Sequence, residues 1–416
     1  MEEPKFTLGQ LVSLSLGMSF FFGVAQISGF IARILFRATL GPEYYGVFAF
    51  LINLFVLFHG LNLFSLNVPI IARISENPSD DAFYRNFSSQ VFSTSLIIGL
   101  LLSIAFIFGA LSVTQEYVLI IYLALTMILY ATGQILHCFP RGRERFRPSA
   151  ISLVLVGLVR IILLVFFMVL GTTNLLVAML VYTLPFLAWW ATYLYLEGIP
   201  SLSFPRLKFI VSVYSDAFVS HLYPLSLQIP IVLGIVFLTG FHGFGVAGDF
   251  DIALIPYYAL TSLLVGISFV IISKARKMPD FRSTMKKMVP SIFLPIFLLC
   301  GLIIITAYFV DTPVRIVLTI LSLPMSVYWP VVLLISIGIT THVLISFLVS
   351  YFQGLGVIKP VGVIAVLCSF GSIPLQIAFA YYYSIEGVVL SIILVNITIA
   401  MLLLGYGYRT SKDTRS

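Results

Sequence analysis

The sequence predicts an all-α polytopic membrane protein with about twelve transmembrane helices, grouped as two consecutive lobes of six. Hydrophobic residues make up 60% of the 416 positions and charged residues only 9%, which is too little ionic cover for the surface of a soluble domain. Apolar stretches of roughly 20 residues, the length at which a helix crosses about 30 Å of hydrocarbon, recur along the chain. Lysine and arginine gather in every second loop, as in proteins oriented in a membrane.

The predicted spans follow one another with short loops. Lipid offers no water to unpaired backbone groups, so only helices or a closed barrel can cross it, and stretches of this length exclude barrel strands. The first lobe is predicted to hold spans at 8–35, 45–70, 87–110, 117–139, 149–170 and 175–196, and the second at 209–238, 247–272, 289–309, 331–352, 360–383 and 386–408. Pro324 interrupts the apolar run within 311–329, which we interpret as an extension or a re-entrant piece.

The first residues lack the pattern of a secretory signal peptide. Glu2 and Glu3 stand where a basic n-region would be expected, and no small-residue cleavage site follows the first apolar run. We therefore expect the first span to be retained as a transmembrane helix.

The distribution of positive charge predicts the orientation in the membrane. Nineteen lysines and arginines fall at the ends and loops on the side of the termini, and only Arg33, Arg37 and Arg315 fall on the other side. Cytoplasmic loops carry this excess, so both termini are expected in the cytoplasm and the protein in the cell membrane. The net charge of +7 is explained by this topology and by anionic lipid head groups, without nucleic acid as a partner.

Two loop motifs indicate an internal repeat. Gly142, four residues, Arg147 and Pro148 follow the fourth span, and Gly354, four residues, Lys359 and Pro360 follow the tenth. Similarly, Tyr45-Gly46-Val47-Phe48 opens the second span and Ala247-Gly248-Asp249-Phe250 opens the eighth. We predict lobes at 1–200 and 201–416, related by a pseudo-twofold axis along the membrane normal because each holds an even number of spans. A substrate path between two lobes follows from that arrangement.

One face of the first span carries polar and charged side chains. Ser19, Gly23, Gln26, Arg33 and Arg37 are spaced by three, four or seven residues, so they share one helical face. This face is expected to line an aqueous cavity, where the two arginines bind an anionic group because a guanidinium fork matches phosphate oxygens. The alternative is that both arginines extend to the outer interface and bind nothing.

Further polar residues inside spans are candidates for binding or coupling. Asn53 and Asn67 in the second span and Arg160 in the fifth join the candidate substrate-binding residues, with Gly60 on the asparagine face. The competing explanation for the asparagines is interhelical hydrogen bonding. For Arg160 it is pairing with a neighbouring residue. The candidates for coupling to a proton or sodium gradient are Asp216 and His221 in the seventh span and His59 in the second.

Motifs for catalysis, nucleotides or metals are absent from the sequence. It contains no nucleotide-binding loop, no GxSxG and no HExxH. Cys138, Cys300 and Cys368 each stand alone in apolar segments, which is typical of packing residues. We therefore predict no enzyme activity and no cofactor.

Several segments together resemble the Wzx-type polysaccharide exporters of the multidrug/oligosaccharidyl-lipid/polysaccharide flippase superfamily, to which MATE transporters also belong. Leu40-Gly41-Pro42-Glu43-Tyr44-Tyr45-Gly46-Val47-Phe48 is similar to the family's LGPEEYGLF, and Arg141-Gly142-Arg143-Glu144-Arg145-Phe146 to its RGLERF. Gln353-Gly354-Leu355-Gly356 and Ile385-Glu386-Gly387-Val388-Val389 are similar to its QALG and GILGAA stretches.

The resemblance implies a MATE-like, two-lobed fold that alternates between inward-open and outward-open states and moves lipid-linked saccharides across the membrane. Its partners would be the lipid-linked glycan, membrane lipids and glycan-assembly enzymes. The chain departs from the pattern in the seventh span, where Pro230 occupies the position at which many relatives have an aspartate. Ion coupling is therefore not carried over from the resemblance.

The leading hypothesis is flipping of a lipid-linked oligosaccharide, with its anionic head group held in a cationic central cavity. A cation-coupled drug exporter of the MATE type is expected to need a buried carboxylate cluster in the first half, and the sequence shows none there. A membrane-embedded glycan polymerase or ligase is expected to carry a large outer loop, whereas these outer loops are short. A scaffold that transports nothing is the third alternative.

Overall fold

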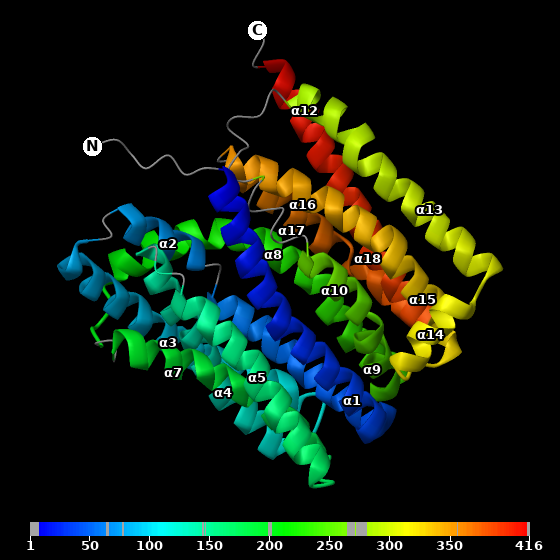
Figure 1. Cartoon of the computed structure of the whole chain (residues 1–416), viewed down its shortest axis with the longest axis horizontal. Helices are drawn as coiled ribbons and strands as arrows, with labels where there is room; N and C mark the ends of the chain where they lie inside the picture. The colour runs from blue at the N-terminus through cyan, green and yellow to red at the C-terminus, as the bar shows by residue number, and fades with distance from the viewer. Residues whose placement is uncertain are drawn as a thin grey trace. The chain divides into compact units, whose positions relative to one another are not determined.

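The computed structural model describes residues 8–63, 66–76, 79–143, 145, 147–198, 202–263, 271, 281–355 and 357–413. Within these ranges the regular structure is helical throughout, as predicted (Figure 1). Eight of the described helices are long and apolar enough to cross a membrane, and a bent helix pair would make nine. The prediction of an all-α polytopic membrane protein is confirmed.

Helix α1 joins two predicted spans at a break, and α18 joins the end of the predicted span 360–383 to the predicted span 386–408. Helix α1 (Leu8–Leu63) contains Gly41 with φ 77° and ψ 169°, and α18 (Ile373–Asp413) contains Ser384 with φ 53° and ψ −133°. Glycine tolerates the positive φ because it has no Cβ, and the following Pro42 cannot donate a helical hydrogen bond, so the chain turns here. Divided at these residues, the described helices follow the predicted spans in order.

Contacts between Cα atoms group Val24–Val232 as one compact unit. After α1 it contains α2 (Asn67–Glu76), α3 (Asp81–Leu111), α4 (Tyr117–Gly142), α5 (Arg147–Val169), α6 (Leu175–Thr183), α7 (Leu187–Glu197) and the first part of α8 (Leu207–His242). Helices α3 and α4 pack against each other along much of their length, and α5 packs against α7 (Figure 1). The second unit begins at Leu233 and also takes in the start of α1.

The second unit holds the remaining helices. They are α9 (Phe244–Ala253), α10 (Ile255–Leu263), α12 (Phe281–Met288), α13 (Leu294–Phe309), α14 (Thr312–Ile320), α15 (Tyr328–Leu333), α16 (Ile339–Gly354), α17 (Ile358–Gly371) and α18. Helix α18 packs against both α16 and α17. The predicted span 247–272 is described only to residue 263 and at Ile271. The placement of the lobes, their boundary at residue 200 and the pseudo-twofold axis stay predictions.

The ambiguous stretch 311–329 forms a short helix and a turn. Helix α14 bends by 91° from α13, and its nine residues are too few to cross the hydrocarbon. Ser322 then takes a positive φ of 54°, and Pro324 follows in extended conformation, so the chain reverses before α15. The stretch is therefore no additional span.

The second predicted span ends earlier than the sequence indicated. Helix α1 ends at Leu63, and Asn67 begins the separate helix α2. Residues 64 and 65 lie outside the described residues, so the heptad spacing from Asn53 to Asn67 stays a prediction. Helix α2 is amphipathic and places Ile70 and Ile74 in a buried cluster with Phe139 of α4 and Val213 of α8, which Leu66 before the helix also joins.

The glycine of the loop motif after the fourth span has a packing role. Gly142 is the last residue of α4, and a Cβ built on it would lie 2.5 Å from Cβ of Ile74 in α2. Real Cβ contacts are not this close, so only glycine lets α2 approach α4 at this point. Close by, Arg143 lies 3.6 Å from the ring centroid of Tyr84 and pairs with Asp81 at 2.5 Å.

Candidate functional site

Two arginines converge on one tyrosine inside the first unit. Tyr182 lies near the end of α6, which Asn174 caps by accepting the backbone N–H of Val177 at 2.9 Å. The guanidinium carbon of Arg33 lies 5.2 Å from the centroid of the Tyr182 ring, and that of Arg160 lies 5.0 Å from it. Arg33 also donates from Nη2 to the Tyr182 hydroxyl at 3.0 Å. We call these three residues the arginine–tyrosine cluster.

Arg160 connects three helices through its side chain. Its Nη1 donates to the carbonyl of Ala25 at 2.9 Å and to Oγ of Ser28 at 3.1 Å, both in α1. Its Nη2 donates to the carbonyl of Tyr182 at 3.3 Å, and the guanidinium lies 5.4 Å from the Phe186 ring. Only 3% of Arg160 is exposed, so little of its guanidinium is accessible to a ligand. Its hydrogen bonds instead hold α1 and α6 in position around the site.

The approach of Arg160 to α1 depends on a small residue. A Cβ built on Gly29 would lie 3.2 Å from Nη1 of Arg160, which is tighter than ordinary packing. Gly29 therefore leaves space for this guanidinium, and Ser28 provides a hydrogen-bond acceptor for it. The sequence left open whether Arg160 faces a cavity or pairs with a neighbour. The described contacts of Arg160 are with neighbouring helices.

The cluster holds two guanidinium groups close together. Within the described part of the chain, Arg160 has no carboxylate partner, and its partners are carbonyls, a hydroxyl and aromatic rings. Arg33 is 7% exposed and lies near Arg160, so two cations share a site of low dielectric constant. Like charges repel more strongly in such a site than in water.

Arg37 continues the same face of α1, four residues after Arg33, and is 8% exposed. Gln26, another member of the predicted stripe, is half-buried, and none of the described hydrogen bonds joins it to the cluster. The side chain of Ser19 lies outside the described residues. The structure thus brings Arg33 of α1 and Arg160 of α5 together, and Arg37 continues the face of α1 that carries Arg33.

A second polar group surrounds His59. Its Nε2 lies 3.2 Å from Oε1 of Gln134, and Nε2 of Gln134 donates to the Tyr130 hydroxyl at 3.2 Å. The ring of Tyr130 packs edge-to-face on Phe186, with centroids 4.0 Å apart. Phe186 in turn touches Arg160, so the two groups share an aromatic wall.

The remaining candidates are placed less directly. Asn53 donates to the carbonyl of Ala49 in its own helix at 2.8 Å and is 7% exposed. His221 is buried in α8, with Pro224 and Pro230 following it. The side chains of Asn67 and Asp216 lie outside the described residues.

Sequence reasoning missed Tyr182 and Ser28. Tyr182 is one of only two polar residues in the stretch Leu-Leu-Val-Ala-Met-Leu-Val-Tyr-Thr, which is the signal that points to it. Its contact with Arg33 spans 149 positions, which no local spacing reveals.

Comparison with solved structures shows the fold. The chain is similar over 97% of its length to an inward-facing multidrug resistance MATE family transporter of the MOP superfamily, with TM-score 0.67, 15% identity and 98% of that chain covered. MATE in complex with MaD3S matches with TM-score 0.64 and 15% identity over 97% of this chain and 96% of that one.

A third similar structure is a MOP superfamily transporter from Pyrococcus furiosus, for which reverse polarity of the binding pocket suggests a different function. It has TM-score 0.60 and 14% identity, with 98% of this chain and 96% of that one covered. At these identities the likeness concerns the fold alone. A search of curated proteins finds no match.

The family is shown by the sequence. The model of the family described as "Polysaccharide biosynthesis protein" matches residues 18–273, which is more than half of the chain and includes Arg33, Arg160 and Tyr182. With this match and the fold of the MATE transporters, the chain is a multi-pass membrane protein that belongs to the polysaccharide biosynthesis protein family.

Proposed function

We propose that this protein is an alternating-access flippase that moves a lipid-linked oligosaccharide or polysaccharide unit from the cytoplasmic to the outer leaflet of the cell membrane. The carrier is a polyprenyl phosphate or diphosphate, and both termini of the protein face the cytoplasm. The family's connection to polysaccharide biosynthesis and the transporter-like fold support this function.

The arginine–tyrosine cluster is the observation that carries the proposal. Burying a cation in a membrane lobe is costly, so buried arginines are retained where they serve a purpose. The planar guanidinium of Arg33 has the shape and charge that suit phosphate oxygens, and Arg160 adds positive charge beside the same tyrosine ring. Arg37 extends the cationic face along α1. A phosphate or diphosphate is the ligand that this charge suits best.

A cationic drug is a poorer fit to the same residues. It would meet two positive charges around Tyr182. Within the described residues, Arg160 has no carboxylate partner that would neutralise its charge. Transporters that share this fold differ in the polarity of their binding pockets, as the Pyrococcus furiosus protein illustrates. The fold alone therefore does not decide the substrate, and the charge of the site does.

The test of the substrate uses purified protein in liposomes that contain a fluorescent polyprenyl-diphosphate disaccharide in one leaflet. We expect protein-dependent movement of the label to the other leaflet, measured by its accessibility to a membrane-impermeant quencher. A cationic dye enclosed in parallel vesicles is expected to stay inside. Movement of the dye without movement of the glycan would overturn the proposal.

Coupling to a proton or sodium gradient is part of the proposal, with His59, His221 and Asp216 as candidates. His59 supports it best, because its imidazole is linked through Gln134 and Tyr130 to the wall of the arginine–tyrosine cluster. In the same vesicles, an imposed pH gradient or sodium gradient should accelerate flipping. His59→Gln should remove that acceleration, while an equal rate with and without each gradient would exclude coupling.

A further inference from the structure

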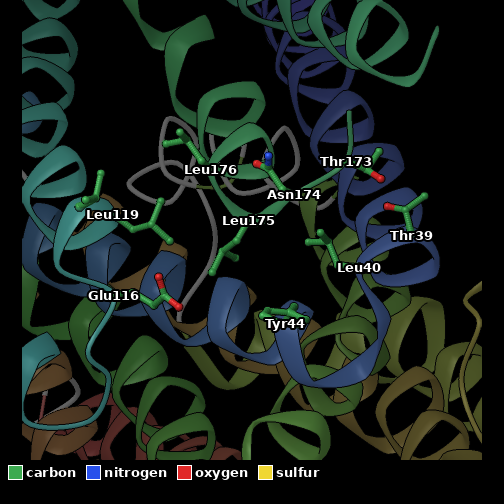
Figure 2. Close-up of a pocket in the computed structure, with 10 residues that line it drawn as sticks. Thr39, Leu40, Tyr44, Glu116, Leu119, Thr173, Asn174, Leu175 and Leu176 are labelled. Atoms are coloured by element: carbon green, nitrogen blue, oxygen red, sulfur yellow. The ribbon is translucent and has the colours of Figure 1, made fainter. Parts of the chain in front are cut away.

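A pocket of about 630 Å³ lies at one end of the first unit, away from the arginine–tyrosine cluster. Three turns that are separated in the chain build it: the break in α1, the turn before α4 and the turn before α6. Its lining includes Thr39, Leu40, Tyr44, Glu116, Asn174 and Leu175. Figure 2 shows Asn174 across the pocket from Tyr44 and Glu116. A volume of this size is typical of pockets for small ligands. We call it the rim pocket.

The polar groups of the rim pocket match a ligand that both donates and accepts hydrogen bonds. The side-chain oxygen of Asn174 is used to cap α6, which leaves its amide N–H groups for a ligand. Thr39 donates to the carbonyl of Leu35 at 2.9 Å, which leaves its oxygen as an acceptor. Glu116 adds a carboxylate without an ion-pair partner among the described residues. Sugar hydroxyls satisfy donors and acceptors of this kind together.

The apolar lining fits the faces of a pyranose ring. Tyr44 is 62% exposed, so its ring is available for stacking, and Leu40 and Leu175 contribute aliphatic surface. The C–H face of a sugar packs on such a ring, as apolar groups do on aromatic faces generally. An aromatic platform beside a carboxylate and an amide therefore suits a neutral sugar better than a purely apolar ligand.

The charge of the rim pocket excludes the ligand that the arginines favour. Its lining holds one carboxylate and no lysine or arginine, so a phosphate would be repelled. A metal ion is also a poor fit, because no group of three metal-binding side chains occurs in the described part of the chain. The two sites thus have complementary chemistry.

The same two helices connect the rim pocket with the arginine–tyrosine cluster. Leu40 follows Arg33 by seven residues on one face of α1, and Tyr182 follows Leu175 by seven residues on one face of α6. Seven residues of helix extend about 10 Å. A molecule whose sugars are attached next to its phosphate can therefore present phosphate to one site and sugar to the other.

We propose that the rim pocket, lined by Tyr44, Glu116 and Asn174, binds a neutral sugar residue of the transported glycan. This inference rests on the proposed function, which places a lipid-linked glycan at the arginines. The phosphate is held by charge and the sugar by stacking and hydrogen bonds, so one substrate is recognised at two points.

The test measures binding of free sugars, which have neither phosphate nor lipid. Saturation-transfer NMR is recorded on the protein in nanodiscs with maltotriose and with the methyl glycosides of glucose, galactose and N-acetylglucosamine. We expect a transfer signal from at least one of these probes. Loss of the stacking ring in Tyr44→Ala, or of the acceptor charge in Glu116→Gln, should weaken binding at least about fivefold. Tyr117→Ala is the matched control, because Tyr117 is exposed at the same turn without lining the pocket.

The outcomes separate this inference from the proposed function. Flipping of the polyprenyl-linked glycan with equal sugar binding in wild type and in both pocket variants overturns the inference alone. Sugar binding that depends on Tyr44 in a protein that flips no glycan overturns the proposed function and leaves the pocket assignment standing. Absence of any sugar signal in wild type overturns the inference. So does native mass spectrometry that shows retention of phosphatidylethanolamine, instead of sugar, in a manner that depends on Glu116.

Discussion

The interiors of the two units differ in the charge that they bury. Among the described residues, the unit Val24–Val232 buries three arginines, Arg33, Arg37 and Arg160, whereas the unit from Leu233 onward buries Asp251 as its only charged side chain. In the second unit the buried polar groups are mostly hydroxyl, thiol and amide groups. Ser336 and Thr340 donate to carbonyls one turn earlier in their own helix, and Cys300 donates to the Ser336 carbonyl at 2.9 Å.

Among the described residues, buried arginines therefore occur in the first unit and not in the second. Hydroxyl groups that bond within their own helix are inexpensive in a membrane and need no ligand. Buried guanidinium groups are expensive and call for a counter-charge. The proposed phosphate site is therefore a property of the first unit, and substitutions in the two units should have different consequences.

The largest effect is expected from Arg160→Gln. The substitution removes the donors to the carbonyls of Ala25 and Tyr182 and to Ser28, and leaves these acceptors buried. The cost in unfolding free energy should be about 2–4 kcal/mol, measured by denaturant titration of the purified protein in micelles. The comparison variant is Thr341→Val, whose hydroxyl bonds within its own helix and should matter less. Equal losses in both variants would show that the arginine has no special structural role.

The next effect concerns the close approach of α2 and α4. Gly142→Ala places a methyl group against Ile74, so it should lower the unfolding free energy by about 1–3 kcal/mol. In the second unit, Gly301 has no atom within 4 Å of its ideal Cβ position, and Gly301→Ala should leave the stability unchanged or slightly higher. Both variants are compared in thermal unfolding scans at equal detergent concentration. A normal melting temperature for Gly142→Ala would mean that α2 shifts freely.

A smaller effect is expected from removing single hydroxyl groups. Tyr182→Phe keeps the aromatic ring but loses the bond to Arg33, so flipping should slow about fivefold, which corresponds to one hydrogen bond. Tyr257→Phe in the second unit loses a comparable bond to His342 at 3.1 Å. Its flipping rate should stay close to that of wild type. Equal slowing in both variants would remove the functional distinction between the units.

The sequence predicts the order of the spans because hydropathy reports directly on the membrane. It also points to Arg33 and Arg160, since a charge in an apolar run is conspicuous. It does not predict Tyr182, because an uncharged tyrosine in an apolar helix gives little signal and its partners are distant in the chain. The sequence does not indicate that the described helix α1 stops at Leu63 and that Asn67 is the first residue of α2, because the apolar pattern continues across both.

The proposed function predicts that the guanidinium of Arg33 binds the phosphate of a lipid-linked glycan, so the flipping rate should depend on this side chain. The initial rate of flipping is compared among liposomes that contain wild type, Arg33→Gln, Arg33→Lys and Arg315→Gln at equal protein density. Arg315 is the control because it is exposed on α14, where it pairs with Asp311. We predict a loss of about tenfold or more in Arg33→Gln, an intermediate rate in Arg33→Lys and no change in Arg315→Gln. An Arg33→Gln protein that flips the glycan at the wild-type rate would contradict the account.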